Sequence, residues 1–373
     1  MVTRDWPSHA PPLGLPKDQL DTPALCLDLD LLESNIRQMA ERCRAANVAW
    51  RPHSKAHKSP DIAALQLAAG ALGVTCAKLG EAEVMAHAGV TDILVANQIV
   101  GPSKLERLVA LARRVPLIVA VDDRAQVDPL AAAVRRGGVE CRVLVEVDIG
   151  LARAGVAPGP PAVELAARVA RQPGLALAGI MGYEGHLLTV PDPAEKRSRI
   201  HAALELLAQT ARALEHRGLP CPIVSAGGTG SYRYTIECPA VTELQAGGLI
   251  FMDAFYRHTC QVEEFQHALT LVTTIVSRPA ADRAIVDAGR KSQHAELHSP
   301  RVVGRDDVHF ERLSAEHGQF RLDATARELR VGDRLELIPG YSDFTTVLHD
   351  VFYGFRNGHL ECIWPLAARG RLT

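Results

Sequence analysis

From about Val48 to about Asp253, short runs rich in β-branched residues alternate with longer Ala-, Leu- and Arg-rich stretches of helical period. The short runs predict eight strands, at 48–52, 73–77, 92–96, 117–121, 142–148, 177–183, 222–226 and 242–251. The stretches between them predict helices, for example at 60–69, 80–88, 103–114, 161–171 and 194–217. Eight parallel βα units favour a closed (β/α)8 barrel of the TIM type over an open doubly wound sheet.

The remainder of the chain has a different pattern. After about Tyr256 the apolar segments, at 269–276, 284–287, 334–338 and 359–364, are short and punctuated by Gly or Pro. They predict a small β domain, which the early run 24–27 can join as an extra strand. We therefore predict an N-terminal arm and strand over 1–28, a barrel over 29–255 and a C-terminal β domain over 256–373.

The composition is that of a globular protein with small-molecule partners. Of 373 residues 47% are hydrophobic, and 41 Lys+Arg against 43 Asp+Glu leave a net charge of -2. No long run of one sign favours nucleic acid or a membrane surface. No apolar stretch approaches the roughly 20 residues that span a bilayer, and the first residues lack the apolar core of a signal peptide. We expect a cytoplasmic protein whose eight widely spaced cysteines are free thiols.

A barrel carries its functional residues on the loops that follow its strands. After the first predicted strand comes Arg51-Pro52-His53-Ser54-Lys55-Ala56-His57-Lys58, with three cations and two histidines in eight residues. Such crowding is unfavourable unless an anion or a cofactor compensates it. A lysine amine among cations also loses its proton more readily and attacks an aldehyde better. Lys55 is therefore a candidate Schiff-base lysine, and the alternative is a solvated basic turn.

Two glycine-rich loops follow the last predicted strands. Gly227-Gly228-Thr229-Gly230 offers backbone amides and a hydroxyl, and Gly247-Gly248 offers a second set of amides. Amides in this position commonly cradle a phosphate in barrel enzymes, although a tight strand-to-helix connection would also require glycines. An amine nucleophile and a phosphate cradle at one barrel mouth are the two attachments that pyridoxal 5′-phosphate (PLP) needs.

With these residues in place, the sequence resembles the D-threonine aldolase and D-serine dehydratase group of PLP enzymes, whose fold is alanine racemase-like. The resemblance covers most of the chain. Its most specific motifs are the lysine segment 51–58, Glu146-Val147-Asp148-Ile149-Gly150, Ser225-Ala226-Gly227-Gly228-Thr229, Phe251-Met252-Asp253, Val286-Asp287-Ala288-Gly289 and Pro339-Gly340-Tyr341-Ser342-Asp343.

The resemblance implies roles for individual residues. Lys55 matches the lysine that carries PLP, and Arg153 lies where the group's arginine approaches the phenolic oxygen of PLP or the substrate carboxylate. Tyr183 corresponds to a tyrosine that lines the cofactor. His53 is a candidate for proton transfer, with a structural role as the alternative. The phosphate contacts correspond to Gly227, Gly228, Thr229, Gly247 and Gly248.

One motif departs from the group. There a Pro-Gly/Asn-His-x-Asp or His-x-Cys segment supplies two ligands to a divalent cation. Here Tyr341 stands at the histidine position, while Asp343 is retained as the candidate ligand. One carboxylate is a poor metal site, because a divalent ion normally recruits several protein ligands. Binding of Mn²⁺ or Mg²⁺ is therefore left open, and Tyr341 is a candidate acid/base or a packing residue of the β domain.

The resemblance implies a lyase that cleaves D-3-hydroxy amino acids to glycine and an aldehyde, and it implies a homodimer. Two other PLP reactions stay open: dehydration of D-serine or 3-hydroxyaspartate, and racemisation with Lys55 and Tyr341 as the two bases. A non-catalytic PLP-binding protein is the alternative from a different class of function. A phosphate-binding barrel enzyme without PLP is the remaining alternative.

Overall fold

The computed structural model describes residues 10–373, so residues 1–9 of the predicted N-terminal arm lie outside the described part. The chain forms two compact units. The barrel unit comprises Asn35–Leu249, Tyr256–Glu264 and Ala367–Thr373. The sheet unit comprises the residues up to Ser34 together with Ile250–Phe255 and Phe265–Leu366.

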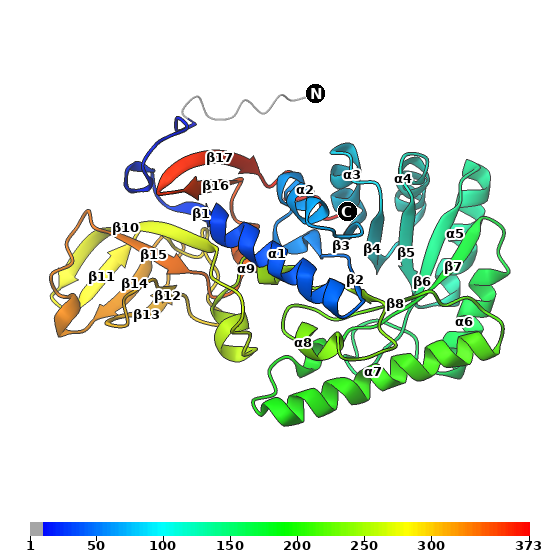
Figure 1. Ribbon diagram of the computed structural model, residues 1–373. Coiled ribbons are helices and arrows are strands. Elements are labelled where there is room, and N and C mark those ends of the chain that lie inside the picture. Colours follow the sequence, from blue (N-terminus) through cyan, green and yellow to red (C-terminus); the bar gives the residue numbers. More distant parts are fainter. Residues whose placement is uncertain (1–9) are drawn as a thin grey trace. The chain divides into compact units, whose positions relative to one another are not determined.

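The barrel unit is built on eight parallel strands (Figure 1). They are hydrogen-bonded in the order β2-β9-β8-β7-β6-β5-β4-β3. A parallel bridge between His53 and Thr75 joins the two ends of this series, and the N–H of Thr75 donates to the Pro52 carbonyl at 2.9 Å. The prediction of a (β/α)8 barrel is confirmed. The strands are β2 (Ala49–Trp50), β3 (Val74–Cys76), β4 (Ile93–Gln98), β5 (Leu117–Val121), β6 (Cys141–Glu146), β7 (Leu175–Met181), β8 (Ile223–Ala226) and β9 (Glu243–Leu244).

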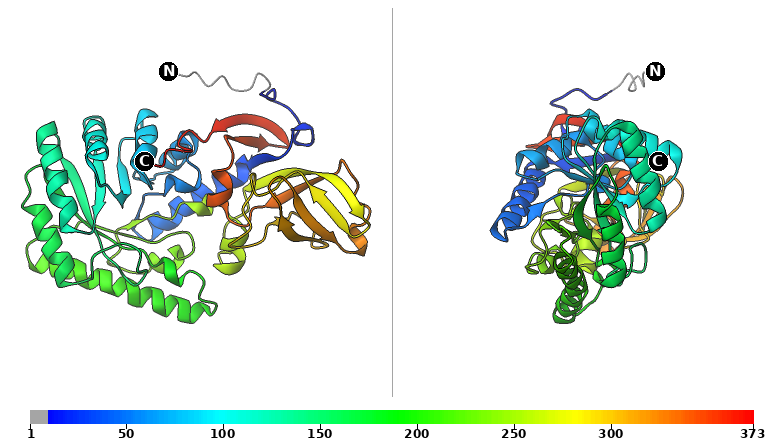
Figure 2. Two further views of the ribbon diagram at one scale, coloured as in Figure 1. Left: turned by 180° about the vertical axis from the view of Figure 1, so that it is seen from behind. Right: turned by 90° about the vertical axis from the view of Figure 1, so that its right-hand side faces the viewer.

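Helices between the strands cover the outside of the barrel (Figure 2). Proline in the first turn starts several of them, where its missing N–H has no helical partner to lose. Inside the strand layer, apolar side chains of β4, β5, β6 and β7 form one core cluster. The helices are α1 (Leu29–Ala45), α2 (Pro60–Ala68), α3 (Leu79–His87), α4 (Pro102–Ala112), α5 (Arg124–Gly137), α6 (Pro160–Ala170), α7 (Pro193–His216) and the short α8 (Tyr232–Thr235).

The last predicted strand is much shorter in the structure. The prediction placed it at 242–251, but β9 ends at Leu244 and a 3₁₀ turn follows at Gly248–Ile250. Beyond the strand end Gly247 packs against the backbone of His53, where an added Cβ would lie 2.3 Å from the carbonyl oxygen. The prediction was therefore wrong beyond Leu244.

Among the residues that the structure describes, the sheet unit contains nine strands, the first residues of α1 and the short helix α9 (Ser342–Thr346). Its main path runs β13-β14-β11-β10-β1-β16-β17, and β15 pairs with β10 and β12. Strand β1 (Ala24–Asp28) lies inside this path, antiparallel to β10 and parallel to β16. The other strands are β10 (Leu269–Ala280), β11 (Arg283–Val286), β12 (Arg301–Val302), β13 (Val308–Leu313), β14 (Gly318–Leu322), β15 (Arg334–Ile338), β16 (Val351–Arg356) and β17 (His359–Pro365).

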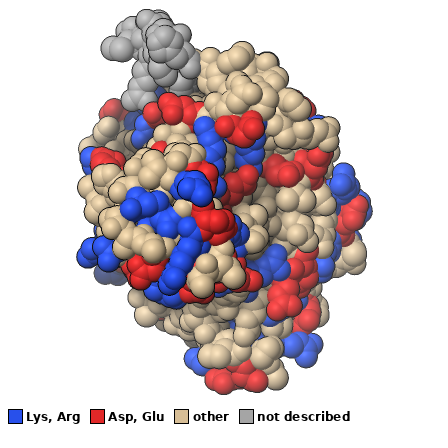
Figure 3. Space-filling model, turned by 90° about the vertical axis from the view of Figure 1, so that its left-hand side faces the viewer, with Lys and Arg blue, Asp and Glu red and all other residues tan. Residues whose placement is uncertain are grey.

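Charges of both signs are interleaved on the face of the molecule shown in Figure 3. This face therefore has no continuous basic stripe of the kind that tracks nucleic acid. Among the described residues, no helix is long and apolar enough to cross a membrane. All eight cysteines are free thiols.

Candidate active site at the barrel mouth

Lys55 lies in a tight 3₁₀ turn, Ser54–Ala56, directly after β2. His53 caps the turn, because its Nδ1 accepts the backbone N–H of Lys55 at 3.4 Å. The N–H groups of His57 and Lys58 both donate to the Ser54 carbonyl, at 3.1 and 2.7 Å. These bonds fix the backbone on both sides of Lys55.

A buried carboxylate from the next βα unit holds the same turn. Glu81, in the first turn of α3, accepts the Ser54 hydroxyl at 2.7 Å and the Ala77 N–H at 2.8 Å. The ammonium of Lys58 lies 3.6 Å from the same carboxylate, and both side chains are buried. Glu81 therefore ties the residues before and after Lys55 to one point of the barrel.

The cations of the lysine segment have different surroundings. Arg51 is fully buried and pairs with Glu243 at 2.8 Å and with Asp92 at 2.9 Å. Lys58 faces Glu81. These two cations therefore have carboxylate partners inside the barrel unit, so their charge is compensated within the protein. This compensation within the protein weakens the argument from charge crowding that the sequence suggested.

The two histidines of the segment are both held neutral. Burial, followed by the positive charges of Lys55 and Lys58, keeps the pKa of His53 well below its usual value. Burial also lowers the pKa of His57 to about 3, and its Nδ1 accepts the N–H of Ser59 at 3.1 Å. His57 is fully enclosed, which favours a structural role. His53 is partly exposed and can accept a proton.

The two glycine loops lie next to each other and to the lysine segment. Gly247 touches the backbone of His53, and the N–H of His53 donates to the Gln245 carbonyl at 3.1 Å. A Cβ on Gly248 would lie 3.3 Å from the Thr229 hydroxyl and 3.0 Å from the ring of Tyr256. Tyr256 and Thr229 thus pack closely against residue 248, which has little room for a side chain.

Arg153 and Tyr183 continue the rim from β6 and β7. The Arg153 guanidinium lies 5.9 Å from the centre of the Tyr183 ring, and a Cβ on Gly228 would lie 2.9 Å from the Tyr183 hydroxyl. Arg153 is 61% exposed and lies 3.8 Å from the carboxylate of Glu146. Burial raises the pKa of Glu146, which also accepts a hydrogen bond from Gln98 at 2.6 Å.

The predicted residues of the barrel unit therefore form a continuous arc of contacts. It runs from Arg153 through Tyr183 and the loop 227–229 to Gly247-Gly248, and then through His53 to Lys55. Two neighbours of this arc, Glu81 and Tyr256, were not singled out from the sequence. Glu146, the last residue of β6, belongs to a motif noted in the sequence but had no assigned role. His186 is an exposed imidazole whose Nε2 lies 2.9 Å from a Cβ built on Gly150.

Tyr341 and Asp343 belong to the sheet unit, at the start of α9. The Tyr341 hydroxyl donates to Oδ2 of Asp343 at 3.1 Å, and both side chains are buried. The tyrosine ring packs edge-on against Phe255 and Phe344, with ring centres 5.5 and 4.9 Å apart. Tyr341 thus packs its ring within the sheet unit and forms a hydrogen-bonded pair with Asp343.

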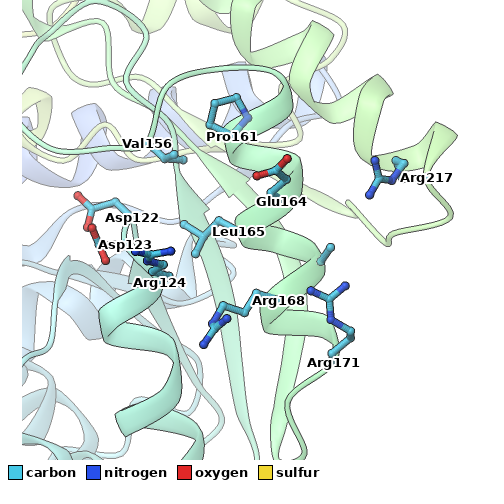
Figure 4. A pocket seen from close by; sticks show the side chains of 11 residues that line it. Asp122, Asp123, Arg124, Val156, Pro161, Glu164, Leu165, Arg168, Arg171 and Arg217 are labelled. Carbon is cyan, nitrogen blue, oxygen red and sulfur yellow. The ribbon is translucent and has the colours of Figure 1, made fainter.

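A separate cavity of about 480 Å³ lies on the barrel unit beside α6 (Figure 4). Its lining mixes carboxylates such as Asp122 and Glu164 with guanidinium groups such as Arg168 and Arg171. Arg168 itself pairs with Asp128. None of the predicted site residues lines this cavity, so the candidate site remains the arc at the barrel mouth.

The chain is similar to known proteins along almost its whole length. The model of the alanine racemase N-terminal domain matches residues 27–254, and that of a putative serine dehydratase domain matches 268–355. The 3-hydroxy-D-aspartate aldolase of Paracoccus denitrificans (strain Pd 1222) is 38% identical, covering 96% of this chain and 94% of its own. The D-threonine aldolase of Arthrobacter sp is 38% identical, covering 96% of both. The crystal structure of D-threonine aldolase from Filomicrobium marinum superposes with a TM-score of 0.95 at 41% identity, covering 97% of this chain and 100% of that one.

Proposed function

Since the chain belongs to the family that shares the alanine racemase N-terminal domain, we propose that it is a PLP-dependent lyase that cleaves D-3-hydroxy amino acids to glycine and an aldehyde. The similarity to two aldolases over almost the whole chain supports this reaction class. The observation that carries the proposal is the arc of contacts that joins the lysine turn to both glycine loops.

The residues of the arc fit PLP. Lys55 would carry the cofactor aldehyde, and the amides of Gly227, Thr229, Gly247 and Gly248 would hold its phosphate, whereas the predicted contact from Gly228 is not available, because its N–H donates to the Ser231 hydroxyl at 3.1 Å. Without a side chain at residue 248, the backbone there approaches the Thr229 hydroxyl closely, which brings the two loops of the proposed phosphate site together. When bound, PLP supplies an electron sink for the charge left at Cα.

The remaining groups of the arc can bind and orient the substrate. The exposed guanidinium of Arg153 can donate two parallel hydrogen bonds to a substrate carboxylate. The carboxylate of Glu146 lies 3.8 Å from this guanidinium. His53 is neutral because of its lowered pKa, so it can accept the proton of the 3-hydroxyl group. His186 is a second imidazole at the same rim and is the natural comparison for this role.

The test uses purified holoenzyme with D-threonine and D-3-hydroxyaspartate, with the L-enantiomers as controls. We expect glycine and the matching aldehyde from the D-substrates. Lys55→Ala should lose both turnover and the visible absorbance of the bound cofactor. His53→Gln should lower kcat more than His186→Gln while both keep that absorbance.

Other products would assign another reaction. An oxo acid with ammonia would identify a dehydratase, which the match of residues 268–355 to a putative serine dehydratase domain favours as the second candidate. Solvent deuterium at Cα without cleavage would identify a racemase. Bound cofactor without any turnover of D-amino acids would leave a non-catalytic PLP-binding protein.

We also propose that the protein acts in the cytoplasm as a homodimer. Eight free cysteines are typical of a reducing compartment. The dimer rests on the family resemblance, and light scattering of the holoenzyme measures it directly.

A further inference from the structure

Arg153 lies in a closed loop of the barrel unit that follows β6. A parallel bridge between Val147 and Val156 closes the loop. The Val156 N–H donates to the Glu146 carbonyl, and the Val156 carbonyl accepts the Asp148 N–H, each at 2.9 Å. The Arg153 side chain is 61% exposed, and its ion pair with Glu146 is long, at 3.8 Å. The position of the guanidinium therefore depends on the backbone of the loop that carries it.

Two carboxylates hold this backbone in an uncommon conformation. Gly150, Ala152 and Gly155 have positive φ angles of 116°, 53° and 111°, a region that is sparsely populated for alanine. Asp148 holds the first half of the loop from within, because its Oδ1 accepts the N–H groups of Gly150 and Ala152 at 2.9 and 3.0 Å. The second half is held from a different βα unit: Asp122, directly after β5, accepts the Gly155 N–H through Oδ2 at 2.9 Å.

Asp122 is itself fixed by Gln126 in the first turn of α5. The Gln126 Nε2 donates to Oδ1 of Asp122 at 2.7 Å, and the Gln126 Oε1 accepts the Asp122 N–H at 2.9 Å. Both oxygens of the Asp122 carboxylate thus have an N–H donor. Asparagine at residue 122 would supply one acceptor and would direct its own NH₂ group at the other donor.

The cavity beside α6 borders this contact (Figure 4). Asp122 and Val156 both belong to its lining, so the space next to the anchor is not filled by side chains. Packing on this side therefore does not hold the loop when the hydrogen bond to Gly155 is lost. The carboxylate of Asp122 sets the position of the second half of the loop.

We propose that Asp122 is a positioning residue for substrate binding, which holds the Gly155 N–H and thereby places the Arg153 guanidinium for the substrate carboxylate. This proposal rests on the proposed function. Two parallel hydrogen bonds to a carboxylate need a defined orientation of the guanidinium plane. A displacement of about 1 Å can cost roughly 100-fold in rate. Asp122 acts through Arg153 and takes no part in breaking the bond.

Binding of D-alanine to the holoenzyme tests the proposal, because D-alanine has the carboxylate but no 3-hydroxyl group for cleavage. Its Kd is measured by titration of the visible cofactor absorbance. Asp122→Asn should raise this Kd at least about tenfold while the amount of bound cofactor per chain stays the same. The matched control is Asp123→Asn, because Asp123 caps α5 through the Ala125 N–H at 2.7 Å. Asparagine caps a helix equally well, so the control should keep the wild-type Kd.

A double-mutant cycle shows whether Asp122 acts through Arg153. In the background of Arg153→Ala, adding Asp122→Asn should change the Kd of D-alanine less than about twofold. A further loss as large as that in the wild-type background would overturn the proposal. Loss of bound cofactor in Asp122→Asn with an unchanged Kd would also overturn it. If Asp122→Asn does not fold, Gln126→Ala tests the same anchor and should raise the Kd to a smaller extent, and a wild-type Kd in that variant would overturn the proposal.

Hydrogen exchange separates this proposal from the proposed function. The peptide that spans residues 148–156 should exchange its amide hydrogens faster in Asp122→Asn than in the wild type and in Asp123→Asn, and this readout needs no ligand. Equal exchange in all three proteins would refute the anchor. A wild type that does not bind D-alanine would overturn the role in carboxylate binding. A wild type that binds D-alanine but cleaves no D-3-hydroxy amino acid would refute the proposed function and leave the positioning role supported.

Discussion

Replacing Glu81 by Gln should destabilise the barrel unit strongly, because the carboxylate is fully buried and serves three partners at once. Glutamine keeps the shape and can still accept the Ala77 N–H, but its amide carries no charge, and the Ser54 hydroxyl must then turn its proton to the Thr75 carbonyl at 3.0 Å. It also leaves the Lys58 ammonium, whose side chain is 7% exposed, without its carboxylate. Removing one partner of a buried ion pair costs about 3–5 kcal/mol.

A free-energy cost of this size predicts a measurable fall in the melting temperature. For a unit of this size, 1 kcal/mol corresponds to roughly 2–4 °C, so the melting temperature should fall by roughly 6–20 °C. The matched control is Glu83→Gln on the same helix, which removes a partly exposed pair with Arg107 at 2.7 Å. An exposed pair contributes about 0–1 kcal/mol, so this variant should melt near the wild type.

Thermal and urea unfolding, followed by circular dichroism, measure both variants. Lys58→Met combined with Glu81→Gln should cost less than the sum of the single changes by about 1–3 kcal/mol, because neither charge is then left buried alone. The cofactor absorbance should fall in Glu81→Gln, since the turn that carries Lys55 loses its anchor. Equal melting temperatures for Glu81→Gln and Glu83→Gln would refute the reasoning.

Three further outcomes are expected. If neutral His53 accepts the substrate proton, kcat/KM should stay level as the pH falls from 8 through 6.5 and decline only below that, because its pKa is depressed; a limb centred near 6.5 would assign the role to another group. The pKa of His57 is about 3 in the folded protein, so between about pH 6.5 and 3 only the unfolded state protonates this imidazole. The free energy of unfolding should therefore fall by about 1.4 kcal/mol for each pH unit as the pH falls through this range. Urea titrations of His57→Asn should show a pH dependence smaller by one proton. Gly247→Ala should lower the free energy of unfolding by about 1–3 kcal/mol and weaken cofactor retention in equilibrium dialysis, because its Cβ would lie 2.3 Å from the His53 carbonyl oxygen. Unchanged retention would show that the site does not need this contact between Gly247 and the lysine segment.

The barrel strands could be predicted because their residues are buried on both faces and form continuous apolar runs. In β5 all five residues, Leu117–Val121, are buried, and the predicted range is the same. The sheet unit gave a weaker signal. Strand β13, Val308–Leu313, has charged and partly exposed residues along most of its length and was not predicted.

The residues of the candidate site likewise divide into those that the sequence predicts and those that it does not. Lys55 and the glycine loops could be selected because they directly follow strands of a barrel. Glu81 could not, since it lies 27 residues after Ser54 in the sequence and only packing brings its carboxylate to that hydroxyl. Tyr341 and Asp343 are two residues apart, but the sequence does not reveal that the phenol of one donates to the carboxylate of the other.

The position of β1 in the sheet unit has a consequence for synthesis on the ribosome. This strand is made early, yet its neighbours β10 and β16 begin at Leu269 and Val351. At about 5–20 residues per second, the gap of about 320 residues between β1 and β16 takes roughly 16–65 s. All eight barrel strands are synthesised within that interval, and during it the apolar run Ala24–Leu27 has no neighbouring strand to pair with. A nascent chain stalled after Glu264 would therefore carry an unpaired apolar strand, and such chains should depend on chaperones more than the finished protein does.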